Sequence, residues 1–171
     1  NQAGCTYEDG PTQTFSNEMD STECAYIGGM WFDGNVQGFQ FVIKSGSITT
    51  TDSSVLDGSA VDINFNVLVE PNWERDFNDD GIIDFSGTMI MGFSMTGVPI
   101  PPGDTTLVTV GFTDYMDNAI CYEYNDCSDG ACINAVSDAS FNSVDTDWGD
   151  CTCSGGDVAD CADVCGGTAV V

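Results

Sequence analysis

The stretch Gly38-Phe-Gln-Phe-Val-Ile-Lys44 indicates how this chain folds. Its apolar residues Phe39, Phe41 and Ile43 occupy every second position, and the polar Gln40 lies between the first two. Successive side chains of a β-strand point to opposite faces, so this alternation predicts a strand with one buried face. A sheet that covers a core on that face is the simplest fold to expect.

Similar alternation predicts further strands on both sides of this stretch. The clearest runs from Ala60 to Glu70, where five apolar residues alternate with polar ones. Other strands are expected at 30–32, 88–96, 105–113, 119–124 and 133–136. Segments with helical periodicity are essentially missing. Seven or eight short strands separated by turn signals predict an all-β fold, an antiparallel β-sandwich.

The composition divides the chain into three parts. Residues 1–26 are polar and are expected to form an irregular or strand-like N-terminal segment tied down by a disulfide. Residues 27–148 contain the predicted strands and would form the β-sandwich domain. Residues 149–171 are rich in Gly and Cys, which predicts a short disulfide-stapled C-terminal appendage or linker.

The charge of the chain excludes several classes of partner. There are 28 acidic residues against Lys44 and Arg75, with no His, and the formal net charge is −26. Such a chain cannot neutralise the phosphates of a nucleic acid, and it is repelled by anionic lipid. No apolar stretch approaches the 18 residues or more of a membrane-spanning helix, so no membrane span is expected.

One acidic segment matches a calcium loop. The stretch Asp76-Phe-Asn-Asp-Asp-Gly-Ile-Ile-Asp84 follows the pattern D-x-N-x-D-G-x-x-D, in which alternate residues aim oxygen atoms at one point. Gly81 would permit the sharp turn. The expected ligands of Ca²⁺ are Asp76, Asn78, Asp80, the carbonyl of Ile82, and Asp84.

This loop departs from the helix-flanked calcium loops called EF-hands. Its twelfth position is Gly87 rather than a bidentate Glu, and its flanks read as strands. The missing ligand would come from elsewhere, for example from Glu74. The alternative is an Asp- and Asn-rich hairpin turn that binds no metal.

Two further acidic clusters are weaker candidates for calcium. One consists of Asp145, Asp147 and Asp150, and the other of Glu123, Asn125, Asp126 and Asp129. A solvated turn is the alternative in both cases.

The cysteine content indicates disulfides. Nine cysteines in 171 residues are usual for an extracellular protein. A zinc site formed by Cys151, Cys153, Cys161 and Cys165 is the alternative, although the spacing departs from paired C-x-x-C motifs. The disulfide candidates are Cys5, Cys24, Cys121, Cys127, Cys132, Cys151, Cys153, Cys161 and Cys165.

The sequence does not fix the connectivity of these cysteines. We expect a bridge between Cys5 and Cys24, one within the group Cys121, Cys127 and Cys132, and two within the last four cysteines. One cysteine is left over, and it could pair between chains or with a neighbouring repeat.

Catalysis finds little support in the sequence. The absence of His excludes Ser-His and Cys-His nucleophile arrangements. Carboxylates are abundant, but no pair of them is marked out as a glycosidase pair in an apolar pocket. We therefore expect that the protein is not an enzyme.

Several motifs resemble those of a known family. The strand Gly38-Phe-Gln-Phe, the segment Met91-Gly-Phe-Ser-Met-Thr-Gly and the loop Ile100-Pro-Pro-Gly-Asp-Thr-Thr-Leu are similar, in this order, to motifs of cohesin-like modules from large secreted proteins of marine bacteria. The tail from Asp160 to Val171 resembles the D-C-x-G-V-C-G-G repeats that follow such modules. The resemblance implies a jelly-roll-like sandwich, export from the cell and tandem repetition.

Two functions fit these features. The first is a calcium-stabilised structural protein outside the cell, a subunit or repeat of a surface fibre or adhesin that associates with identical copies, with β-strand addition by the tail as one route. The second is a cohesin-like or carbohydrate-binding module that recognises a surface protein or glycan, for which Trp31, Trp73 and Trp148 are candidate stacking residues.

Overall fold

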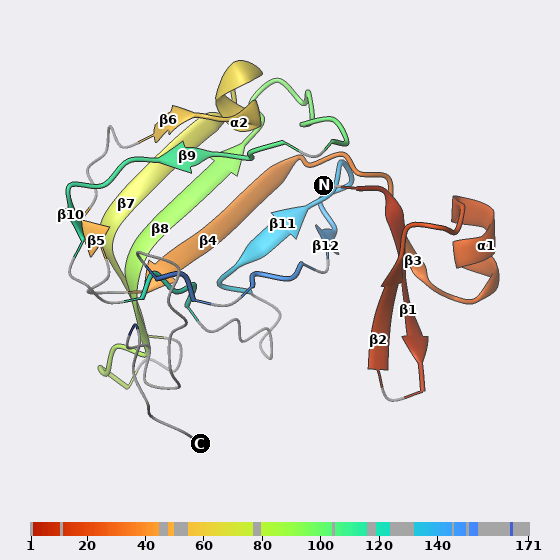
Figure 1. Cartoon of the computed structure of the whole chain (residues 1–171), viewed down its shortest axis with the longest axis horizontal. Coiled ribbons are helices and arrows are strands. Elements are labelled where there is room, and N and C mark those ends of the chain that lie inside the picture. The colour runs from red at the N-terminus through yellow and green to blue at the C-terminus, as the bar shows by residue number, and fades with distance from the viewer. Residues whose placement is uncertain are drawn as a thin grey trace.

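A computed structural model of the 171-residue chain describes residues 2–10, 12–44, 48–49, 55–76, 80–103, 105–115, 119–123, 132–144, 146–149, 151–153 and 165. These residues form antiparallel sheets and two short helices, which confirms the all-β class (Figure 1). In the part of the chain that is described, no helix is long and apolar enough to cross a membrane.

A five-stranded antiparallel sheet forms the body of the molecule. Its strand order is β12-β11-β4-β8-β7, so β4 and β8 lie in the interior of the sheet. The predicted strand at 38–44 is confirmed as β4. The bounds are Gly38–Lys44 for β4, Asn66–Arg75 for β7, Phe85–Phe93 for β8, Ala135–Ser137 for β11 and Ser143–Val144 for β12.

One face of this sheet carries the hydrophobic core. The register places Phe41 opposite Ile90 and Ile90 opposite Val69, so all three side chains lie on one face. Phe39 lies opposite Gly92, where a Cβ atom would collide with the phenyl ring. The alternation in the sequence therefore fixes the buried face through a cross-strand row of large side chains.

Short elements cover this face. β6 (Val55–Asp57) pairs with β9 (Thr109–Val110), and β9 crosses in front of β7 and β8 (Figure 1). A second short ladder joins β5 (Ile48–Thr49) to β10 (Asp114–Tyr115). The covering segments contribute buried residues to the core, among them Val36, Ala60, Phe65 and Ile100.

The expected strand from Ala60 to Glu70 is wrong in its first half. Residues Ser59–Asp62 form the helix α2, and the strand begins only at Asn66. The backbone amides of Ser59 and Ala60 donate to the carbonyls of Thr106 and Leu107, over 2.9 and 3.1 Å. These tertiary hydrogen bonds, together with complete burial of Ala60, override the local alternation.

The same contacts explain a second correction. A strand was expected over 105–113, but only Thr109–Val110 pairs with a neighbouring strand inside that range. The carbonyls of Thr106 and Leu107 are occupied by α2, so they do not take part in a ladder. Within the expected strand at 119–124, Ile120 and Tyr122 form isolated bridges.

A small N-terminal unit lies at one end of the sheet (Figure 1). It contains a three-stranded sheet of order β2-β1-β3, with bounds Gly4–Asp9 for β1, Thr12–Ser16 for β2 and Met30–Phe32 for β3. The helix α1 (Ser21–Tyr26) packs beside it, although no helix was expected there.

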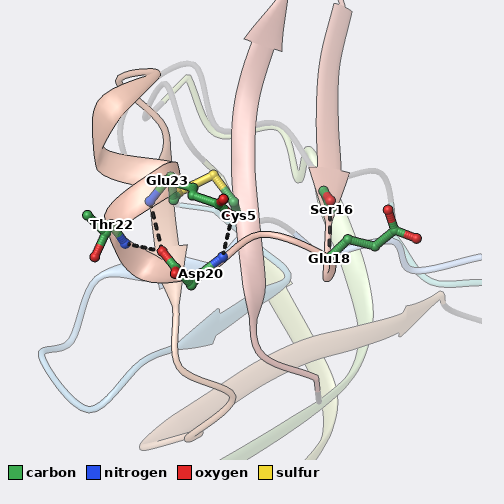
Figure 2. The surroundings of a disulfide bond; sticks show 7 residues. Cys5, Ser16, Glu18, Asp20, Thr22 and Glu23 are labelled. Carbon is green, nitrogen blue, oxygen red and sulfur yellow. Dashed lines mark hydrogen bonds between the residues drawn. A yellow bond between two sulfur atoms is a disulfide. The ribbon is translucent and has the colours of Figure 1, made fainter.

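Asp20 starts this helix with a capping box (Figure 2). Its carboxylate accepts from the amides of Thr22 and Glu23 over 2.8 and 2.9 Å, and the Glu23 carboxylate accepts from the amide of Asp20. The disulfide between Cys5 and Cys24 ties α1 to β1, as predicted. The division of the chain at 26/27 and at 148/149 stays a prediction.

Candidate functional site

The predicted calcium loop connects β7 to β8. The amide of Asp84 donates to the carbonyl of Arg75 over 2.9 Å, which closes the hairpin at the base of the loop. Residues 77–79 lie outside the described residues, so Asn78 is not placed. The structure brings Asp76, Asp80, Ile82 and Asp84 into one hairpin loop.

Two Asp side chains shape the described part of this loop. Asp76 Oδ2 accepts from the amide of Gly81 over 2.8 Å, and Asp80 Oδ1 accepts from the amide of Ile82 over 2.8 Å. Gly81 has a φ of +84°, a conformation that side chains disfavour. Hydrogen bonds to its own carboxylates therefore shape this part of the loop. Gly81 adopts the sharp turn that the motif predicts.

The second carboxylate oxygen of Asp76 is unusual. Asp76 Oδ1 is buried and has no hydrogen-bond partner among the residues that the structure describes. A buried anionic oxygen without a partner is costly, and an ion that binds there is one explanation of such an atom. Calcium prefers carboxylate oxygen as a ligand.

The described residues supply only part of a metal site. Within them, no group of three or more His, Cys, Asp or Glu side chains is arranged to hold a metal ion. A complete calcium site would thus need Asn78 and backbone carbonyls in addition to the described carboxylates. Glu74, the suggested further ligand, lies on β7 opposite Ser86 and is exposed.

The second acidic cluster is placed in part. Asp147 is exposed, and its Oδ1 accepts from the amide of Gly149 over 2.9 Å in a local turn. Asp145 and Asp150 lie outside the described residues. In the third cluster Glu123 is described, whereas Asn125, Asp126 and Asp129 are not.

The tryptophans occupy different parts of the fold. Trp31 lies on β3 of the N-terminal sheet and Trp73 on β7 of the main sheet. Trp148 packs against Phe41 and Tyr122, with ring centroids 6.0 and 5.4 Å apart. The Trp148 and Tyr122 rings are tilted by 59° to each other, so this pair is not a flat stacking surface.

The disulfides link segments in a partly unexpected way. Cys121 pairs with Cys151, and Cys153 pairs with Cys165. Cys121 therefore does not pair inside its own cluster, and the last four cysteines cannot form two bridges among themselves. The amide and carbonyl of Thr152 pair with those of Ile120, so the backbone brings Cys151 beside Cys121.

The remaining cysteines are described in part. Cys132 is also disulfide-bonded. Cys127 and Cys161 lie outside the described residues. Three of the four cysteines of the alternative zinc site, namely Cys151, Cys153 and Cys165, are in disulfides, which overturns that alternative.

A turn between β11 and β12 was not singled out from the sequence. The Asp138 carboxylate accepts from the amides of Ser140 and Asn142 and from the side chain of Asn142. Burial alone would raise the pKa of Asp138, but these three hydrogen bonds outweigh it and hold the pKa below its ordinary value. The sequence signal that could have predicted this turn is the spacing of Asp138 and Asn142 within a run of turn-forming residues.

Comparisons with known proteins do not assign the chain to a family. No protein-family model, no curated protein and no solved structure matches it.

Proposed function

We propose that this chain is a calcium-stabilised structural module of an extracellular assembly, a subunit or repeat of a cell-surface fibre or adhesin. The observation that carries the proposal is the buried Asp76 Oδ1, inside a loop whose sequence follows a calcium pattern. This oxygen has no hydrogen-bond partner in the described part of the chain. A cation at this point would supply the missing partner.

The ion would bind a mixed set of oxygen atoms. Asp76, Asp80 and Asp84 would supply carboxylates, Asn78 an amide oxygen and Ile82 a carbonyl. These residues lie between two strands that are paired over most of their length, so the ion would fasten one end of the β7-β8 hairpin. It would also offset part of the repulsion within a chain of net charge −26.

The disulfides support a location outside the cell. Disulfides persist in oxidising compartments and are rare in the cytosol. Here two of them lie beside a small cluster whose described buried residues are Ala119, Cys121 and Cys153, with Cys151 and Cys165 packed against it. The two disulfides add covalent stabilisation to this cluster.

The arrangement of the main sheet is compatible with the finer expectation of a cohesin-like sandwich. The five-stranded sheet is covered on its core face by segments that include the β6-β9 ladder. The cohesin-like motifs at 38–41 and 91–97 fall on or directly after the adjacent strands β4 and β8. The likeness to cohesin-like modules remains part of the proposal.

The test is sedimentation velocity with electron microscopy, in millimolar Ca²⁺ and after chelation. We expect filaments or large assemblies that fall apart when calcium is removed. A compact monomer under both conditions, at high protein concentration, would overturn the structural role.

A second function is favoured by the outer face of the main sheet. Leu68, Met91 and Phe93 lie on the face opposite the core, where Leu68 is 50 % exposed. A shallow hollow of about 210 Å³ lies beside Met91 and Phe93, between β4, β8 and β11. Such a face suits a binding module of cohesin or carbohydrate-binding type, and capture of a glycan or surface protein by the monomer would support this function.

A further inference from the structure

A groove of about 440 Å³ separates the N-terminal sheet from the edge of the main sheet. This volume is in the range of ligand-binding sites in proteins, and the exposed surface of the groove is mostly apolar. The apolar residues that line it are Phe15, Phe32, Val36, Leu107, Val136 and Val144.

One wall of the groove contains an edge strand. β12 is the last strand in the order of the main sheet, and its Val144 faces the groove together with Val136 of β11. The hydroxyl of Thr146 donates to the carbonyl of Val144 over 2.9 Å, which satisfies that backbone group. An occupant would therefore be held mainly by apolar contacts along β12.

We propose that this groove binds the segment Gly166–Val171 of a second copy of the chain. The inference rests on the proposed structural role and names the contact through which copies join. The segment reads Gly-Gly-Thr-Ala-Val-Val, with three apolar residues at 169–171 that suit an apolar groove. Thr and Val favour the extended conformation that a groove beside a strand requires.

The charge of the chain is compatible with this segment as the occupant. Two copies with a net charge of −26 each repel one another. A segment that enters an apolar groove of another copy should therefore contain no Asp or Glu, because burial of a carboxylate is costly. Residues 166–171 contain no Asp or Glu. The acidic residue that lines the groove is Asp147, which is exposed and can keep its contact with water.

The position of Cys165 favours an occupant from another copy. Cys165 is tied to Cys153, the neighbour of Thr152, which bridges to Ile120. The carbonyl of the adjacent Cys121 accepts from the amide of Lys44, so this region lies at the C-terminal end of β4.

The groove lies at the opposite end of that strand. Val36, which lines it, precedes β4, and β4 spans about 20 Å from Gly38 to Lys44. Ala169 lies four residues beyond Cys165 and reaches at most about 14 Å from it. The anchor of the segment at Cys165 thus lies toward the end of β4 that is away from Val36, which favours the groove of a second copy.

Such a contact is head-to-tail, because a segment of one copy meets a different surface of the next. A head-to-tail contact that does not close into a ring produces an open filament. The proposed contact would therefore convert single modules into a fibre without a second interface.

The test uses two single substitutions in the full chain, in millimolar Ca²⁺. Phe15→Asp places a charge in the groove at a side chain that is 51 % exposed, and Val170→Asp places one in the segment. We expect each variant alone to lose at least about ten-fold of its assembled fraction in sedimentation velocity. Mixed together, they should form a dimer, since one copy keeps the groove and the other keeps the segment.

Controls separate this inference from the structural role. Phe141→Asp changes a phenylalanine that is 77 % exposed and outside the groove, and it should assemble as the unaltered chain does. If Phe15→Asp does not fold, Val170→Asp added to the unaltered chain should still shorten its filaments by capping them. Assembly of Val170→Asp at the unaltered level would overturn the inference and leave the structural role standing, whereas a monomeric unaltered chain would overturn both.

Discussion

The backbone amide of Val42, on strand β4 of the main sheet, donates to the side-chain oxygen of Asn134 over 2.8 Å. The Asn134 amide group in turn donates to the carbonyl of Glu123 over 2.8 Å. β11 pairs with residues 38–40 of β4, whereas the amide of Glu123 donates to the carbonyl of Val42. The Asn134 side chain thus fills the gap between two segments that share one edge of β4.

We predict that Asn134→Ala destabilises the fold by about 2 to 4 kcal/mol. Asn134 is 1 % exposed, and its removal leaves a buried backbone N–H and a carbonyl without these partners. Urea unfolding measures the loss. Asn35→Ala is the control, because Asn35 binds Asp33 in an exposed turn and should change stability little. Equal losses in the two variants would contradict this role of Asn134.

The covalent bridge between Cys121 and Cys151 leads to a second prediction. The two cysteines are 30 residues apart, and a loop of this length gives a disulfide about 3 to 4 kcal/mol of stabilisation. We expect the double variant Cys121→Ser/Cys151→Ser to become sensitive to proteolysis at 119–123 and 146–153. β4, β7 and β8 should stay protected, because their core does not include these cysteines.

Limited proteolysis with mass spectrometry locates the cuts. The variant Cys5→Ser/Cys24→Ser is the matched control, and it should expose α1 and β1 instead. Cleavage throughout the main sheet in the first variant would show that the bridge supports the whole fold.

The sequence predicts best the strand at the centre of the main sheet. β4 is predicted to the residue, and the buried face of Phe39 and Phe41 follows from alternation alone. The capping box of Asp20 and Glu23 was also readable, but its six-residue helix has no apolar period to draw attention to it. Local signals therefore account for the centre of the sheet and for the start of α1.

Other features depend on contacts between distant residues. The helix α2 replaces a predicted strand because Ser59 and Ala60 bind carbonyls that lie 47 residues further along the chain. The pairing of Cys121 with Cys151 depends on the bridge between Ile120 and Thr152, which no local pattern reveals. In the candidate site, the sequence predicts the turn at Gly81, whereas the burial of Asp76 Oδ1 is visible only in the structure.

We predict that Asp138 stabilises the protein above the acid range. Its folded pKa is lowered, so the stabilisation is fully present above the unfolded pKa of about 3.9 and is lost as the pH falls through the folded value. Asp138→Asn should therefore be less stable than the unaltered chain at pH 7, and the difference should shrink by pH 3. Thermal unfolding at the two pH values measures this, and a difference that does not depend on pH would contradict it.

Gly87 gives a prediction about close packing in the sheet. A Cβ atom at this position would collide with the backbone carbonyl of Ile43 on β4. We expect Gly87→Ala to destabilise by about 1 to 3 kcal/mol, since backbone cannot move aside as a flexible side chain can. At Gly103 the nearest atom would be 3.8 Å away, so Gly103→Ala should be neutral. Calorimetry of both variants makes the comparison, and equal melting temperatures would show that β4 and β8 adjust.

The last prediction concerns calcium at Asp76. Calcium at about a hundred times its Kd would stabilise the fold by about 2.7 kcal/mol, which raises the Tm by about 5 to 10 °C for a chain of this size. Asp76→Asn should remove most of this rise, because it keeps the shape of the side chain and an acceptor for the Gly81 amide but loses the charge. Asp33→Asn is the matched control, since Asp33 accepts from the amide of Asn35 in a similar exposed turn outside the loop. Scanning calorimetry with and without a chelator gives the readout. A calcium-induced rise that survives in Asp76→Asn would place the ion at another acidic cluster, and no rise in the unaltered chain would remove calcium from the account of this protein.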